Sequence, residues 1–260
     1  MLTPSFELMV LISLFFYESD NKLFTTDKFT RSVLIKFAEW FKMPNFTSLK
    51  NCIFTEYIFL LKNYLHKNST EAGCDEAGRG CLAGPVCAAA VIMPPDFNHP
   101  QLNDSKKMSL HNRLLLRKEI EDKAIDYAVV FIDNKQIDTI NILKASLVGM
   151  HRALDKLTVT PQHILVDGNK FFAYRDIPHT CVVKGDGKYV SIAAASVLAK
   201  TSRDEYMKKL HKKYAVYGWE KNKGYPTKYH REAIIKYGIS PYHRRSFQLT
   251  NTQTEIDFSG

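Results

Sequence analysis

Two adjacent carboxylates, Asp75 and Glu76, stand directly before a glycine-flanked turn, Gly78-Arg79-Gly80. Carboxylate oxygens are the ligands that hard divalent cations such as Mg²⁺ and Mn²⁺ prefer. A glycine-flanked turn allows backbone N–H groups to approach a phosphate or a sugar hydroxyl closely. Together the two features suggest metal-assisted chemistry on a phosphodiester, although an acidic pair before a glycine turn is more often a solvated strand end.

Two further carboxylates occur where a folded sheet could bring them to the same place. Asp167 ends an apolar run that begins at Ile164, and Asp204 lies within a long predicted helix. Ligand sites in open α/β sheets gather at strand ends, which favours a functional interpretation of Asp167. The alternatives stay open, because Asp167 also begins an Asp-Gly-Asn turn and Asp204 has helical spacing to Lys200 and Lys208.

Clustered carboxylates have a physical cost that a metal can relieve. Several of them close together repel each other unless a divalent cation neutralises them. Two Mg²⁺ ions about 4 Å apart can activate a water and stabilise the leaving oxygen of a phosphodiester. Such a scheme needs no histidine base, and the nine histidines are scattered along the chain. The sequence contains neither a Gly-x-Ser-x-Gly motif nor a P-loop.

The elements that must position these residues become clear after Thr70. Strands are predicted over residues 72–75, 85–93, 127–132, 163–166 and 180–184, and helices over 109–124, 141–157, 191–214 and 228–237. The first two strands can pair as a hairpin. This order predicts a mixed sheet with helices on its faces, in which the first and fourth strands end on the acidic residues.

Residues 1–58 differ in character from the remainder, being rich in aromatic residues and poor in glycine. Apolar spacing predicts helices over 31–41 and 53–65, but we find no chemistry in this region. The apolar run at 6–17 is shorter than the roughly 20 residues of a membrane span, and it lacks the pattern of a signal peptide. We therefore expect a cytoplasmic protein without a membrane association.

The net charge of +9 is concentrated near the C-terminus. Residues 200–245 contain 13 Lys and Arg against 4 Asp and Glu, whereas the remainder of the chain is balanced. Basic surfaces of this kind attract polyanions, nucleic acid first, although a solvated helix face would have the same composition.

The five cysteines form no CxxC pair and no zinc-ligand spacing. They are typical of reduced, partly buried thiols in the cytosol.

Three polar segments could bind a substrate, and one of them, His243-Arg-Arg-Ser246, adds two cations. Lys106 and Lys107 belong to a loop that could contact phosphates, or that is simply solvated. Tyr225 stands between a glycine and a proline, in a rigid turn that could present its ring to a sugar or base. An aromatic ring at such a turn is more often packed against the protein than available to a substrate.

The chain from Phe59 to Leu249 resembles bacterial ribonuclease HII, the type 2 ribonuclease H. The matching segments occur in order and at family-like spacing, and they are 74–86, 102–107, 164–169, 184–207, 222–230 and 241–247. The resemblance implies a ribonuclease H-like α/β fold, a mixed five-stranded sheet flanked by helices with a helical C-terminal segment. It divides the chain into an N-terminal extension, 1–58, outside the family pattern, and a catalytic domain, 59–250, whose substrate-binding segment covers about 208–250.

The resemblance also implies an activity. Family members cleave the RNA strand of RNA–DNA hybrids and incise on the 5′ side of single ribonucleotides embedded in duplex DNA, leaving 3′-hydroxyl and 5′-phosphate ends. The expected partners are therefore RNA–DNA hybrids and ribonucleotide-containing duplex DNA, the expected cofactor is Mn²⁺ or Mg²⁺, and the expected state is a monomer.

The site residues that the resemblance implies fall into two sets. The catalytic carboxylates are Asp75, Glu76, Asp167 and Asp204, of which Asp75, Glu76 and Asp167 are taken as the metal ligands. The substrate-binding residues are Gly78, Arg79, Gly80, Lys106, Lys200 and Tyr225. The glycine turn would sense the 2′-hydroxyl, Tyr225 would stack on the deoxyribose after the ribonucleotide, and the two lysines would contact the backbone.

Two other functions stay open at this point. A non-catalytic nucleic-acid-binding module would explain the basic C-terminal region, but it gives no reason for carboxylates at two strand ends. Another metal nuclease of the same fold would cut DNA that lacks ribonucleotides.

Overall fold

The computed structural model describes residues 61–99, 101–102 and 109–250, and these belong to the second of the two units of the chain, Leu60–Gly260. The predicted helix over 31–41 and the predicted contact residue Lys106 lie outside the described residues. The helix predicted over 53–65 is wrong for its last five residues. There the chain is not helical, and Lys62 instead forms an isolated parallel bridge with Tyr189.

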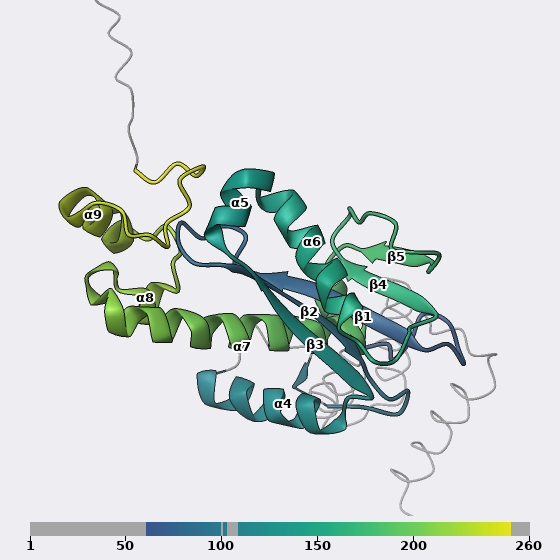
Figure 1. Cartoon of the computed structure of the whole chain (residues 1–260). Coiled ribbons are helices and arrows are strands. Elements are labelled where there is room, and N and C mark those ends of the chain that lie inside the picture. Colours follow the sequence, from purple (N-terminus) through teal and green to yellow (C-terminus); the bar gives the residue numbers. More distant parts are fainter. Residues whose placement is uncertain (1–60, 100, 103–108, 251–260) are drawn as a thin grey trace, which may run out of the picture. The chain divides into compact units, whose positions relative to one another are not determined.

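Five strands form one mixed sheet in the order β3-β2-β1-β4-β5 (Figure 1). The strands are β1 (Glu71–Ala77), β2 (Val86–Ile92), β3 (Asp126–Ile132), β4 (His163–Asp167) and β5 (His179–Val182). The pairs β1–β2 and β2–β3 are antiparallel, whereas β1–β4 and β4–β5 are parallel. The predicted hairpin and the predicted mixed five-stranded sheet are both confirmed.

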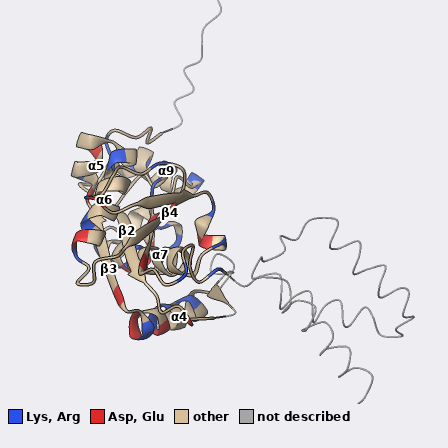
Figure 2. Cartoon of the chain, turned by 90° about the vertical axis from the view of Figure 1, so that its right-hand side faces the viewer, with Lys and Arg blue, Asp and Glu red and all other residues tan. Residues whose placement is uncertain are grey.

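Helices cover both faces of this sheet and one of its ends (Figure 1). The described helices are α4 (Leu110–Lys123), α5 (Asn134–Ile140), α6 (Ile142–Asp155), α7 (Val190–Lys213), α8 (Trp219–Asn222) and α9 (Lys228–Tyr237). The long helix α7 and its neighbour α4 lie on one face, α5 and α6 lie on the other, and α8 and α9 lie beyond the end of the sheet. In Figure 2 the ribbon of α4 is coloured for both basic and acidic residues, as expected of a helix with a solvated side.

The sequence pattern did not reveal α5. This helix has seven residues, about two turns, and it begins where the side chain of Asp133 accepts a hydrogen bond from the N–H of Gln136 (2.8 Å). So short a helix has too few turns for a clear apolar period. It is held instead by this N-cap and by burial of Ile137 in the core.

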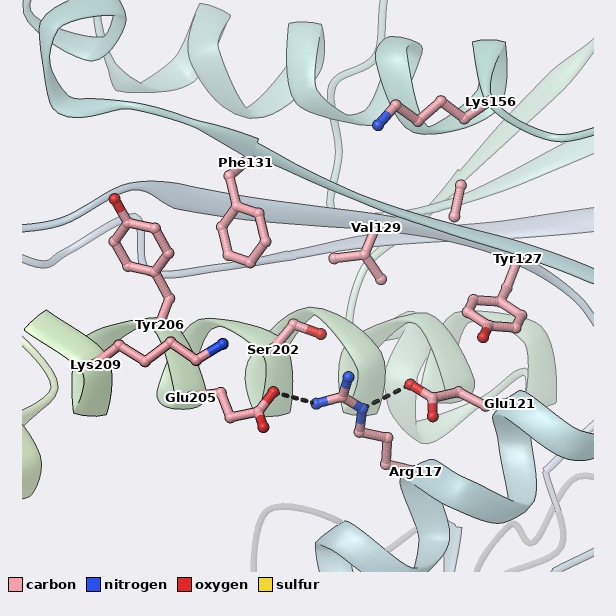
Figure 3. A pocket seen from close by; sticks show the side chains of 11 residues that line it. Arg117, Glu121, Tyr127, Val129, Phe131, Lys156, Ser202, Glu205, Tyr206 and Lys209 are labelled. Atoms are coloured by element: carbon pink, nitrogen blue, oxygen red, sulfur yellow. Dashed lines mark hydrogen bonds and ion pairs between the residues drawn. The ribbon is translucent and has the colours of Figure 1, made fainter.

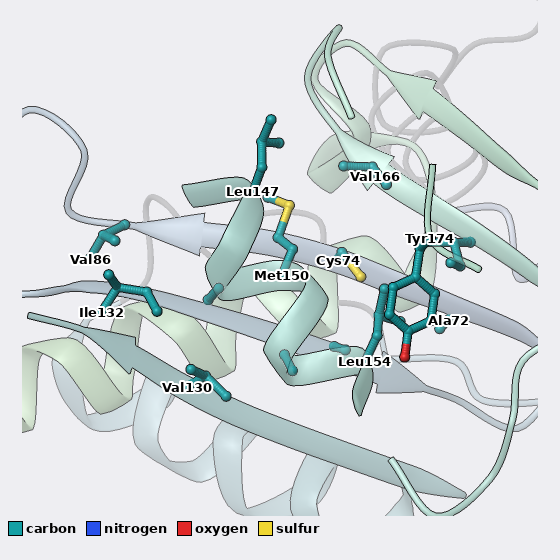
Figure 4. Packing of buried hydrophobic residues seen from close by; sticks show 14 of the residues in the cluster. Ala72, Cys74, Val86, Val130, Ile132, Leu147, Met150, Leu154, Val166 and Tyr174 are labelled. Carbon is teal, nitrogen blue, oxygen red and sulfur yellow. The ribbon is translucent and has the colours of Figure 1, made fainter. Parts of the chain in front are cut away.

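Two hydrophobic cores lie on opposite faces of the sheet. On the α6 face, Cys74 and Val166 pack against Met150 of the helix, together with the other labelled side chains of Figure 4. On the α7 face, Ala89 and other residues of β2 pack against the alanine-rich start of α7. Because β2 is buried on both faces, its sequence is a continuous apolar run rather than an alternating one.

Four cysteines lie in the described residues and none of them forms a disulfide. Cys74, Cys81 and Cys87 are buried, and Cys181 is half-buried, as the sequence predicts for reduced thiols. No helix among the described residues is long and apolar enough to cross a membrane. The cytoplasmic location and the monomeric state stay predictions.

A buried pair of histidines holds the C-terminal segment together. His230 Nδ1 lies 2.9 Å from the carbonyl of Tyr225, and His230 Nε2 accepts a hydrogen bond from Trp219 Nε1 (3.0 Å). His243 Nε2 lies 3.2 Å from that same Nε2, and its Nδ1 accepts the N–H of Ser240 (2.9 Å). These contacts fit two neutral rings, with the proton on Nδ1 of His230 and on Nε2 of His243, and the one lone pair of His230 Nε2 is then shared between the N–H groups of Trp219 and His243.

We expect the protein to lose stability between pH 7 and pH 5. Burial and the neighbouring His230 lower the pKa of His243 to about 4, and burial also lowers the pKa of His230. Each neutral ring therefore stabilises the fold fully above its unfolded pKa of about 6.5, and this contribution is lost as pH falls toward the folded value. Thermal melts at pH 7.5 and pH 5.0 measure the loss.

The matched control is His243→Gln, which removes the titrating ring. This variant should be less stable than wild type at pH 7.5, yet it should show a smaller drop in melting temperature on acidification. An unchanged drop would show that other groups cause the pH dependence.

Candidate metal and substrate site

The parallel pairing of β1 with β4 places two of the predicted carboxylates side by side. Cys74 is the register partner of Val166, so the next residues along, Asp75 and Asp167, occupy the same level at the carboxyl ends of both strands. Partners in register lie on the same face of a sheet. Here it is the α7 face, since the Ser196 hydroxyl of α7 hydrogen-bonds the Asp75 carboxyl.

Asp75 is buried in an environment that disfavours its charge. The residue is 6% exposed, and its carboxylate accepts the N–H of Glu76 (2.7 Å). Burial raises the pKa of Asp75 well above its ordinary value, and the nearby charges of Glu76 and Asp167 raise this pKa further. Without a compensating cation, the ionised form of Asp75 is therefore unfavourable in the fold.

Glu76 interacts with the turn that follows it. Its carboxylate pairs with the guanidinium of Arg79 at 3.1 Å, so Arg79 is oriented across the Gly78–Gly80 turn. Burial raises the pKa of Glu76, and the positive charge of Arg79 opposes this rise. The charge of Asp167 also acts on Glu76, so the three carboxylates are close enough to influence one another.

Asp167 is fixed by the turn before α7. Its Oδ1 accepts the N–H of Gly185 at 2.7 Å. A Cβ on Gly185 would lie 2.6 Å from the side chain of Ile192 and 3.4 Å from Asp167 Oδ1, so glycine is needed for this close approach. The Asp-Gly turn is also present, with Gly168 at φ +104°, so the structural and functional interpretations of Asp167 are compatible.

Asp204 lies further along α7 than the other predicted carboxylates. Ser196, Lys200 and Asp204 follow one another at intervals of four residues, so they lie along one side of the helix, about 12 Å from first to last. Asp204 pairs with Arg113 of α4 at 4.0 Å, a partner that helical spacing does not indicate. Its charge also acts on Cys81 and Tyr225, which places it near the predicted substrate-binding residue Tyr225.

A second ion-pair group next to Asp204 fastens α4 to α7. Arg117 donates to Glu205 (3.0 Å) and to Glu121 (2.7 Å), as Figure 3 shows. These side chains line a pocket of about 530 Å³ between α4, α7 and the exposed face of β3. None of the predicted site residues lines this pocket, so it is separate from the carboxylates.

The Gly78–Gly80 turn rests on two buried arginines. Arg244 donates to the carbonyls of Gly78 (2.8 Å), Arg79 (2.9 Å) and Gly84 (3.0 Å). Arg203 donates to the carbonyls of Pro85 and Ala83, and its side chain lies where a Cβ on Gly78 would be. Of these two, the sequence pattern indicated only Arg244, as a cation that could bind a substrate, and it gave no sign of Arg203. Both lie in the basic C-terminal region, where charge alone suggested a surface.

Tyr225 is presented next to this turn. Its ring is 48% exposed, its hydroxyl hydrogen-bonds the Cys81 thiol, and the guanidinium of Arg203 lies 5.9 Å from the ring centroid. The Tyr225 carbonyl accepts a hydrogen bond from His230, so the turn that carries Tyr225 is also anchored to α9. Tyr225 is therefore neither fully packed nor fully solvated.

The donor set has the chemistry of a site for a hard cation, although the side chains do not form a complete one. Asp75, Glu76 and Asp167 offer only carboxylate oxygens, which suit Mg²⁺ or Mn²⁺ and do not suit zinc. Burial and the neighbouring carboxylates raise the pKa of Asp75, so a bound cation would stabilise its ionised form. Among the described residues, no three His, Cys, Asp or Glu side chains stand in a ready metal-binding arrangement.

The match to a protein-family model decides the relationship. The ribonuclease HII model matches residues 72–250, more than half of the chain. The chain belongs to the ribonuclease HII family. It is therefore a ribonuclease H, an enzyme of a family that cleaves the RNA of RNA–DNA hybrids.

Curated bacterial relatives agree with this assignment. The ribonuclease HII of Christiangramia forsetii is 59% identical over 196 residues, which cover 75% of this chain and 99% of the relative. The ribonuclease HII of Bacteroides thetaiotaomicron is 60% identical over 190 residues, covering 73% and 95%. About a quarter of this ribonuclease HII family member thus has no counterpart in these relatives.

Solved structures show the same fold. Ribonuclease H2 from Pyrococcus horikoshii has a TM-score of 0.59 at 29% identity, covering 69% of this chain and 94% of that protein. A ribonuclease HIII solved in complex with Mn²⁺ has a TM-score of 0.52 at 19% identity, covering 70% and 68%. The ribonuclease H-like fold expected from the resemblance is confirmed.

The two glycines of the turn should respond differently to alanine. Gly78 has φ +95°, and a Cβ there would lie 2.0 Å from Nε of the buried Arg203. Gly78→Ala should therefore lower the free energy of unfolding by about 1–3 kcal/mol. Gly80 has open space around its Cβ position, so Gly80→Ala should stay within about 0.5 kcal/mol of wild type.

Activity separates the two effects. If the open side of the turn faces substrate, Gly80→Ala should lose about tenfold or more in cleavage of an RNA–DNA hybrid while its melting temperature stays unchanged. A fully active Gly80→Ala enzyme would argue against contact at this face of the turn.

Proposed function

We propose that this enzyme incises duplex DNA at single embedded ribonucleotides, in addition to cleaving RNA–DNA hybrids, and that it uses Mg²⁺ or Mn²⁺ held by Asp75, Glu76 and Asp167. The observation that supports this most is the β1–β4 register, which sets Asp75 and Asp167 at one level directly before the Gly78–Gly80 turn. Carboxylates for a cation and backbone groups for a sugar thus adjoin each other on one strand and its turn.

Different residues of the chain would bind different parts of the substrate. Backbone N–H groups of the Gly78–Gly80 turn would approach the 2′-hydroxyl of the ribonucleotide, because only a turn with so little side chain allows such proximity. Tyr225 would stack its ring on the neighbouring deoxyribose. Lys200 and Lys106 would contact phosphates and fix the register of the duplex.

The chemistry would take place beside Asp75. When bound, the divalent cations would supply a polarised water and neutralise charge at the cleaved phosphodiester, leaving 3′-hydroxyl and 5′-phosphate ends. Ser196 and the backbone N–H of Glu76 orient the Asp75 carboxylate, and Gly185 orients that of Asp167. Asp204, on the same side of α7 as Ser196, would complete the acidic set from the side of Tyr225.

A substitution at Asp75 tests the site by two independent measurements. Asp75→Asn should lower cleavage of a duplex bearing one ribonucleotide by about 10²–10³-fold, with binding of the duplex retained. In the absence of metal, the same variant should melt at a higher temperature than wild type. The reason is that the folded pKa of Asp75 lies above its unfolded value, so ionisation at neutral pH destabilises the fold.

Added Mn²⁺ should raise the melting temperature of wild type but not that of Asp75→Asn. Asp122→Asn, which changes an exposed carboxylate of α4, is the matched control and should behave as wild type. Equal cleavage of all-DNA and ribonucleotide-containing duplexes would point instead to a DNA nuclease of the same fold.

Tyr225 should contribute to junction recognition more than to overall affinity. Tyr225→Ala should lower cleavage at a single embedded ribonucleotide by about 10-fold, since stacking on one nucleotide contributes about 1–3 kcal/mol, and it should weaken total duplex binding less. Tyr237→Ala, at a similarly exposed tyrosine of α9, serves as the control. Equal losses of cleavage and binding in Tyr225→Ala would mean that the ring is merely packed.

A further inference from the structure

The most unusual charged group of the fold is the buried guanidinium of Arg244. Arg244 is 0% exposed, and its guanidinium donates hydrogen bonds to three backbone carbonyls. The carboxylate of Asp138 acts on this guanidinium through its charge, but the cost of burying a cation outweighs that effect. Burial accordingly lowers the pKa of Arg244 to about 10. A group kept under such conditions suggests a role that depends on its geometry.

The carbonyls that Arg244 holds determine where the neighbouring N–H groups point. In a planar trans peptide the C=O and the following N–H point in opposite directions, and the described residues contain no cis peptide bond. Since the carbonyls of Gly78 and Arg79 point inward to Arg244, the N–H groups of Arg79 and Gly80 point outward. Both residues are exposed, and within the described residues neither N–H has a hydrogen-bond partner.

The backbone around Arg244 ties this turn to the C-terminal segment. The N–H of Arg244 donates to the carbonyl of Leu82 (2.8 Å), and the N–H of Gly84 donates to the carbonyl of Tyr242 (2.9 Å). Ala83 and His243 form an antiparallel bridge. Arg244 is thus held at both its main chain and its side chain, so its guanidinium can act as a fixed support for the turn.

We propose that Arg244 is a positioning residue for substrate selectivity: by holding the carbonyls of Gly78 and Arg79, it aims the N–H groups of Arg79 and Gly80 at the ribonucleotide. This inference rests on the proposed function, in which the turn senses the 2′-hydroxyl. In addition, the direction in which the N–H groups of the turn point is set by Arg244, a residue of the C-terminal segment that itself touches no substrate.

The test compares Arg244→Lys with Arg231→Gln. Lysine retains the charge but not the planar fork that reaches several carbonyls at once. Arg231 is the matched control, because it also donates to two carbonyls, those of Gln248 and Leu249, but it does not contact the turn. The two readouts are the ratio of dissociation constants for all-DNA and single-ribonucleotide duplexes without divalent metal, and kcat and KM on the single-ribonucleotide duplex.

We expect Arg244→Lys to reduce the binding ratio toward one and to lower kcat/KM by about 10- to 100-fold, as small misplacements of positioning groups do. A purely structural role would reduce the amount of active enzyme, and would leave KM and the binding ratio unchanged. Arg231→Gln should lower the melting temperature and keep the wild-type ratio. A folded Arg244→Lys enzyme with the wild-type ratio would overturn the proposal.

Amide hydrogen exchange on the wild-type enzyme provides a test that does not depend on a variant folding. The N–H groups of Arg79 and Gly80 should exchange rapidly in the free protein and become protected by the single-ribonucleotide duplex, but not by all-DNA duplex. Absence of that protection would also overturn the proposal. If wild type neither cleaves nor prefers the ribonucleotide-containing duplex, the proposed function fails instead, and the two outcomes are thereby distinguished.

Discussion

The contact between Gly73 and the start of α7 sets the position of everything at the site. A Cβ on Gly73 would lie 2.1 Å from the backbone of Ser191, so the helix can approach β1 this closely only at glycine. From Gly73 to Gly78 a strand advances about 16 Å, and from Ser191 to Arg203 a helix advances about 18 Å. The strand and the helix therefore advance by about the same distance over these residues. Ser196 reaches Asp75 and, two turns later, Arg203 reaches Gly78.

This arrangement separates two kinds of charge that the fold stabilises poorly. The strand ends of β1 and β4 carry carboxylates whose mutual repulsion and burial raise the pKa of Asp75 and Glu76. Behind the adjoining turn stand two buried guanidinium groups, Arg203 and Arg244, that satisfy carbonyls. The carboxylates thus lie at a position suited to a cation. The guanidinium groups lie behind a turn suited to the anionic backbone of a nucleic acid.

The sequence predicted the features that depend on local pattern, and it missed those that depend on long-range packing. Apolar runs ending on Asp75 and Asp167 predicted two strands with carboxylates at their ends, and the strand pairing brings those residues to one level. The partner of Asp204 was not predictable, because Arg113 is 91 residues away and no spacing rule connects them. The role of Arg244 was hidden for the same reason, since its carbonyl partners at Gly78 and Arg79 have no side-chain signature.

The concentration of positive charge near the C-terminus has a different meaning once the fold is known. Arg203 and Arg244 are counted in that charge but are buried, so they cannot contribute a surface for nucleic acid. The exposed lysines of α7, among them Lys208 and Lys212, stay available for phosphates. The segment beyond residue 208 is also not an appendage, because Trp219 and Ile234 share a hydrophobic cluster with Leu82 of the β1–β2 connection. In the proposed function, the phosphate contacts and the shape of the Gly78–Gly80 turn therefore depend on the same C-terminal segment.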